Sequence, residues 1–107
     1  MKTIQDVQIW DNGQVKVAKV LNAYAVNVSL NQNAKFYYEL LPLDDQGNIG
    51  GRIAYGNVFM PMEQYLQWSQ DEFAWDFVAN SLNLVITGDY TPPEIIDQPI
   101  ENNPESL

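Results

Sequence analysis

Histidine and cysteine are both absent from this chain of 107 residues. Without cysteine there is no disulfide and no thiolate metal site, so packing alone must hold the fold. Without histidine the chain lacks the commonest general base and metal ligand, and no Ser-His or Cys-His catalytic arrangement can be built. We therefore predict a protein that is not an enzyme, with no catalytic residue, no cofactor and no metal ligand.

Basic residues are scarce. Five Lys and Arg stand against fourteen Asp and Glu, which gives a net charge of −9. Such a charge repels phosphate backbones, so we expect no direct nucleic-acid binding. It would suit a partner with a basic surface, but keeping the protein in solution is the simpler interpretation.

Long apolar runs are missing as well. Near the N-terminus, Asp6 and Gln8 interrupt any stretch that would serve as a signal peptide. No segment approaches the roughly 20 apolar residues that a membrane-spanning helix needs. We expect a protein that is made in a cytoplasm and does not contact a membrane.

Hydrophobic residues make up 46% of the chain and aromatic residues 12%, which is enough for one packed core. The pattern from Ile4 to Trp10 is strand-like, and Asp11-Asn12-Gly13 has the residues of a hairpin turn. A second stretch of strand pattern runs from Gln14 to Leu30, with Asn22 as a candidate bend or bulge.

Alternation continues after the polar turn at 31–33. There Phe36, Tyr38 and Leu40 are predicted on one face and Lys35, Tyr37 and Glu39 on the other. A loop at 44–48 follows, and 49–59 is predicted as the returning strand. Gly50, Gly51 and Gly56 lie within it, so we expect a bulge, a twist or the close approach of another backbone there.

The periodicity becomes helical at Pro61. Ser69 and Glu72 fit a capping box, so Ser69 is the predicted N-cap of a second helix whose apolar stripe includes Phe73, Phe77 and Val78. A short strand at 84–87 ends the pattern. The predicted fold is α+β and mainly β: an antiparallel meander or sandwich-like sheet of about five or six strands, with a helical segment at about 61–82 packed on one face.

The segment 91–107 differs from the rest, because it holds four prolines and four acids and has no basic residue. We predict one folded domain over 1–90 and an acidic, extended tail over 91–107. The isoleucines of that tail are natural anchors for a groove on the body or on a neighbour.

Two acidic groups could in principle carry chemistry. Asp44, Asp45 and Asn48 offer oxygen ligands for calcium but lack the spacing of an EF-hand loop, so a plain turn is the better interpretation. Asp71 and Glu72 sit where a helix start favours acids, with no partner base in view.

Aromatic side chains allow two interpretations, core packing or a binding surface. Tyr38, Trp68 and Phe73 fall on the predicted inward stripe and are assigned to the core, whereas Tyr37 and Trp75 fall outside it. The interface candidates are Tyr37, Trp75, Ile95, Ile96 and Ile100.

A set of apolar motifs over residues 1–90 resembles small virion proteins of tailed bacteriophages. These motifs are Phe36-Tyr37-Tyr38-Glu39-Leu40, the glycine-broken strand around Gly56, Tyr65-x-x-Trp68, and Trp75-x-x-Val78-Ala79-Asn80-x-Leu82-x-Leu84. The resemblance transfers no functional residue, and the acidic tail departs from it. It implies a structural or assembly protein located in the virion, which docks onto other virion proteins or copies of itself.

Two alternatives stay open. The charge of −9 would suit an acidic inhibitor that occupies the basic nucleic-acid site of a host enzyme. Exposed aromatic side chains would suit a carbohydrate-binding module.

Overall fold

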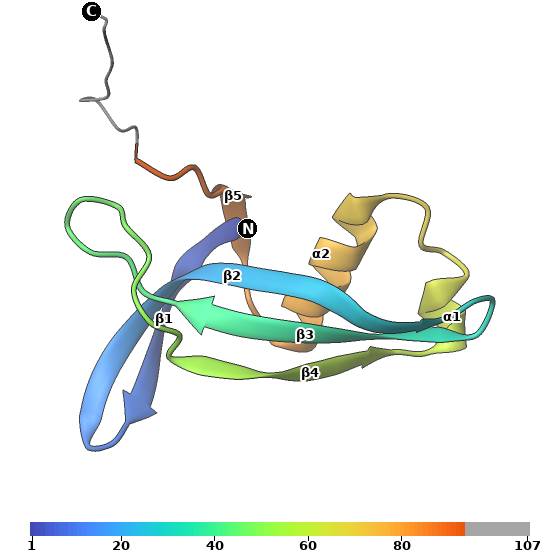
Figure 1. Cartoon of the computed structure of the whole chain (residues 1–107), viewed down its shortest axis with the longest axis horizontal. Helices are drawn as coiled ribbons and strands as arrows, with labels where there is room; N and C mark the ends of the chain where they lie inside the picture. Colours follow the sequence, from blue (N-terminus) through green and yellow to red (C-terminus); the bar gives the residue numbers. More distant parts are fainter. Residues whose placement is uncertain (94–107) are drawn as a thin grey trace, which may run out of the picture.

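The computed structural model describes residues 1–93 and confirms the predicted mainly β fold with a helical layer (Figure 1). Its strands form one open antiparallel sheet in the order β4-β3-β2-β1-β5. The elements are β1 (Lys2–Asp11), β2 (Gln14–Ser29), β3 (Asn33–Leu41), β4 (Ala54–Met60), α1 (Met62–Tyr65), α2 (Asp71–Ser81) and β5 (Ile86–Asp89). The first four strands form a meander and β5 returns beside β1, so β4 and β5 are the sheet edges.

The predicted turn between β1 and β2 is present. Asp11 pairs with Gln14, and the two residues between them, Asn12 and Gly13, have φ values of 49° and 82°. Positive φ at both positions is what a tight two-residue hairpin turn requires, and Asn-Gly supplies it at little steric cost. The resulting β1–β2 arm projects away from the helices (Figure 1).

β2 is one continuous strand of 16 residues, so the irregularity predicted at Asn22 is misplaced. Asn22 pairs regularly with Glu39, and the register of β2 against β3 shifts between Ala25 and Asn27 instead. The side chain of Asn22 donates to Glu39, which favours regular pairing at this position.

β4 begins at Ala54, later than the strand predicted from 49. Ile49 forms only an isolated bridge with Leu43, and the Gly50 N–H donates to the Pro42 carbonyl. The preceding turn is held by Asp44, whose Oδ1 accepts from two backbone N–H groups further along the loop. Residues 42–53 therefore form a closed loop that delays the start of β4.

Both helices lie on one face of the sheet, which we call the helix side (Figure 1). Leu21, Phe36 and Met60 are buried on the strands of this side and Val78 on α2. The core assignment of Tyr38, Trp68 and Phe73 is confirmed, because all three pack against that cluster. No helix within residues 1–93 is both long and apolar enough to span a bilayer.

Ser69 does not cap α2, contrary to the sequence prediction. The N-cap residue is Gln70, and no side chain makes a capping hydrogen bond. Glu72 accepts a hydrogen bond from Lys2 Nζ at 3.0 Å. A capping box needs the acid to reach back to the cap residue, and here the acid ties α2 to β1. The last strand is also shifted, to Ile86–Asp89 from the predicted 84–87.

Candidate functional site

A row of tyrosine rings crosses three strands on the face of the sheet that is turned away from the helices. We call this the open face; its aromatic members are Tyr24 on β2, Tyr37 on β3, and Tyr55 and Phe59 on β4. Ring centroids are 5.3 Å apart for Tyr24 and Tyr37 and 6.4 Å apart for Tyr37 and Tyr55. Such spacings are those of interacting aromatic pairs.

The register of the strands explains why these rings meet. Tyr24 is directly opposite Tyr37, and Tyr55 lies diagonally from Tyr37 because it pairs with Glu39. Directly opposed residues share a face, and diagonal neighbours remain within reach of large side chains. As whole residues, Tyr24, Tyr55 and Phe59 are 53%, 60% and 57% exposed.

Polar side chains are fixed among the rings. Arg52 Nη1 donates to the Tyr37 hydroxyl at 2.6 Å, and that hydroxyl donates to Glu39 Oε2 at 3.0 Å. The Arg52 guanidinium also lies 4.1 Å from the centroid of the Tyr55 ring, within cation–π range. Asn22 holds the other Glu39 oxygen at 3.1 Å. The open face thus presents ordered donors and acceptors beside apolar rings.

The tyrosine at the centre of this network is held in its protonated form. Burial raises the pKa of Tyr37, and its hydrogen bond to Glu39 raises it further, although the Arg52 guanidinium opposes the shift. The hydroxyl therefore stays a hydrogen-bond donor at neutral pH.

Charge differs between the two sides of the sheet. Lys35 and Arg52 accompany Glu39 near the open face, whereas no basic residue follows Arg52 anywhere in the sequence. The helical layer is accordingly acidic, with exposed carboxylates at Glu63, Asp71, Glu72 and Asp76. A partner on the open face would therefore not contact these four carboxylates of the helical layer.

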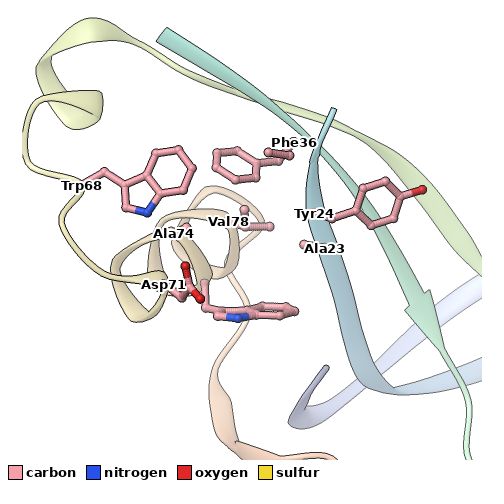
Figure 2. A pocket seen from close by; sticks show the side chains of 9 residues that line it. Ala23, Tyr24, Phe36, Trp68, Asp71, Ala74 and Val78 are labelled. Carbon is pink, nitrogen blue, oxygen red and sulfur yellow. The ribbon is translucent and has the colours of Figure 1, made fainter. Parts of the chain in front are cut away.

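A second feature is an apolar groove on the helix side, between α2 and strands β2 and β3. It has a volume of about 340 Å³. Figure 2 shows Phe36, Trp68 and Val78 around it, Asp71 at the helix start, and Tyr24 pointing away on the other side of β2. The groove continues the core outward, and the charged side chain among its lining residues is that of Asp71.

The two predicted interface residues that lie within residues 1–93, Tyr37 and Trp75, are not brought together. Tyr37 lies at the centre of the open face, half-buried between its two tyrosine neighbours. Trp75 lies on the helix side, where it packs against the core and lines the groove, with Lys2 Nζ 5.8 Å from its ring centroid. The remaining three, Ile95, Ile96 and Ile100, lie outside the described residues.

Sequence reasoning did not single out Tyr24, Tyr55 or Arg52 as members of one site. Alternation assigns Tyr37 to a face, but it does not say which residues of the neighbouring strands stand beside it. That information lies in the register, and the bulge between Ala25 and Asn27 sets part of it. Arg52 fell within the strand predicted over 49–59, whereas it lies in the loop that precedes β4.

The acidic loop at 44–48 is a turn. Asp44 Oδ1 accepts from the N–H groups of Gln46 and Asn48 at 2.9 and 2.8 Å, and the bond from Asn48 is the main reason that the pKa of Asp44 is lowered. Across residues 1–93 no three acidic side chains gather in a way that would hold a metal ion.

Comparison with known proteins gives no relative: no family model, no curated protein and no solved structure matches this chain.

Proposed function

We propose that this chain is a non-catalytic docking protein that binds a partner protein through the open face of its sheet. The observation that supports this most is the row of Tyr24, Tyr37 and Tyr55, the first and last of them exposed, on the side of the sheet that neither α1 nor α2 covers (Figure 1). Contiguous exposed aromatic surface is uncommon on monomeric proteins and is typical of interaction sites.

The composition of the open face also fits docking. Tyrosine and arginine are enriched where interfaces concentrate their binding energy, because they combine large apolar area with directional hydrogen bonds. Tyr37, Arg52 and Glu39 are already fixed by mutual hydrogen bonds. Little side-chain entropy is then lost on binding.

The finer proposal is that the partner is a virion protein and that the chain is a structural or assembly component of a tailed bacteriophage. Its support is the resemblance of the motifs around Phe36, Gly56 and Trp75 to small virion proteins.

Mass spectrometry of purified virus particles tests this proposal. We expect the wild-type chain at a fixed copy number, and a Tyr24→Ala, Tyr55→Ala double variant at a much reduced one. A Leu30→Ala, Leu66→Ala variant is the matched control, since both leucines are exposed outside the open face. Equal incorporation of both variants would count against docking through the tyrosines.

A second candidate function is carbohydrate binding, which the same row of rings favours. Sugar rings stack on exposed tyrosine faces, and their hydroxyls need fixed donors and acceptors such as Arg52, Glu39 and Asn22. A glycan array probed with the wild-type chain and with Tyr55→Ala separates the two functions. A signal that Tyr55→Ala abolishes supports sugar binding, and an array without signal removes it.

A further inference from the structure

The outer edge of β4 is unpaired within residues 1–93, because β3 is its only neighbour in the sheet. β4 has seven residues, none of them charged and none proline, whereas the opposite edge strand β5 has four residues and ends in Gly88-Asp89. Natural proteins usually protect long edge strands with charges, prolines or covering segments, because unpaired backbone groups recruit another strand. β4 lacks the first two protections.

The register shows which backbone groups face that edge. The Leu40 carbonyl accepts from the Ile53 N–H, so the backbone of Leu40 is turned toward β4. Alternate residues of β3 share that direction, and their partners on β4 include Gly56 and Val58. The residues between them, Tyr55, Asn57 and Phe59, therefore direct their N–H and C=O groups outward.

We propose that the edge of β4 pairs with the same edge of a second copy of this chain, antiparallel, with Asn57 on the twofold axis. Asn57 is the middle residue of β4 and would face its own copy. On the open face Tyr55 would then stand opposite Phe59 of the second copy, and Phe59 opposite Tyr55. On the helix side Gly56 would meet Val58. Each large side chain meets an aromatic or a small one, so the strand is complementary to itself.

Two observations favour a second copy of this chain as the partner of the β4 edge. β4 contains no charged residue, so two β4 edges can pair without placing like charges opposite each other, although the chain has a net charge of −9. The pairing also joins the tyrosine rows of both copies through the Tyr55–Phe59 contacts into one aromatic band. An edge-to-edge contact buries less surface than a standard interface, so a weak, reversible dimer follows. The inference concerns the strand edge and does not depend on the partner docking proposed above.

Sedimentation of the purified full chain tests the pairing. We expect the wild-type chain to show a monomer–dimer equilibrium in the micromolar range. A Tyr55→Lys, Phe59→Lys variant places like charges opposite each other and should weaken the dimer by about tenfold or more. A Tyr55→Glu, Phe59→Lys variant places opposite charges at the same positions and should recover most of the lost affinity. Trp10→Lys with Leu30→Lys is the matched control, which adds the same charge at positions 73% and 78% exposed.

Three results would overturn the proposal: a wild-type chain that stays monomeric up to about 1 mM, dimerisation unaffected by the two lysines, or no recovery with the opposite charges. Hydrogen exchange of the wild-type chain gives a readout that does not depend on how the variants fold. The amides of Tyr55, Asn57 and Phe59 should exchange more slowly as protein concentration rises, and rates independent of concentration would contradict edge pairing. Because purified chain suffices, a negative result leaves docking of a different protein on the open face to be judged separately.

Discussion

Gly56 lies against the ring of Tyr38, its cross-strand partner on the helix side: a Cβ added to Gly56 would stand 3.0 Å from both Cε2 and Oη of that tyrosine. The absence of a side chain at this position lets the Tyr38 ring approach the backbone of β4 closely. The close approach of the Tyr38 ring therefore explains why a glycine occupies position 56 of this strand.

We expect Gly56→Ala to lower the free energy of unfolding by about 1–2 kcal/mol, because the added methyl group must displace the Tyr38 ring. Gly51→Ala is the matched control, since a Cβ there meets nothing within 4 Å. Urea denaturation measures both. Equal stability of the two variants would show that the ring adjusts without cost.

The N-terminus of α2 offers a stabilising substitution. Gln70 has the extended backbone of an N-cap residue, with φ −142° and ψ 156°, but its side chain makes no capping hydrogen bond. Gln70→Ser should raise the free energy of unfolding by about 0.5–1 kcal/mol, because a serine hydroxyl reaches the free N–H groups of the first turn. Ser69→Ala should leave stability within about 0.5 kcal/mol of the wild type. A larger loss of stability in Ser69→Ala would show that Ser69 is the N-cap.

The ion pairs of Lys2 give stability a pH dependence with a definite sign. Lys2 Nζ donates to Asp89 on β5 and to Glu72 on α2, while its side chain is only 11% exposed. The hydrogen bond to Asp89, and then that to Glu72, raises the pKa of Lys2, and the same ammonium lowers the pKa of Asp89. The Asp89 contribution is therefore present above pH 3.8, the ordinary value for the carboxyl, and is lost as the pH falls through the lowered pKa.

Denaturation at a series of acidic pH values tests this sign. The wild-type chain should lose stability as Asp89 takes up a proton, and Asp89→Asn should show a smaller loss over the same range. At the alkaline end, the Lys2 contribution should be complete below pH 10.5, the ordinary pKa of the lysine, and be lost as the pH rises from there through the raised pKa. Asp76→Asn, which removes an exposed carboxylate of α2, is the control. An acid profile of Asp89→Asn identical to that of the wild type would contradict the assignment.

The loop at 44–48 should depend on one of its two aspartates. Asp44 accepts from two backbone N–H groups, and Gly47 of the same loop receives a hydrogen bond from the Tyr90 hydroxyl at 2.9 Å. Asp44→Ala should therefore speed proteolysis within the loop, whereas Asp45→Ala should leave the cleavage rate near that of the wild type. Limited proteolysis read by mass spectrometry compares them. Equal cleavage of both variants would show that the side chain of Asp44 does not hold the turn.

The fold was predictable where local chemistry decides the structure. Asn12-Gly13 needs no tertiary information to make a turn, and the alternation around Tyr37 separates two faces by period alone. The position of β4 was not predictable in this way, because Ile49 and Ile53 extend the apolar pattern of β4 backwards, whereas the loop closed by Asp44 keeps 49–53 out of regular pairing.

The site was less predictable than the fold. Tyr37 was identified because one strand is enough to place it on a face, whereas the contacts with Tyr24, Tyr55 and Arg52 depend on the register of three strands. The capping error has a related cause. Ser69 and Glu72 have the right spacing, but Lys2, 70 residues away in sequence, engages the glutamate.

Site-specific photo-crosslinking in the native host cell tests the role of the open face most directly. A photoreactive amino acid is placed at Tyr55, and in a parallel chain at Leu66, which is similarly exposed next to α1. From position 55 we predict one defined adduct with a single different protein, beside any adduct with a second copy of this chain, and none from position 66. No adduct with a different protein from position 55, or the same adducts from both positions, would contradict docking through the open face.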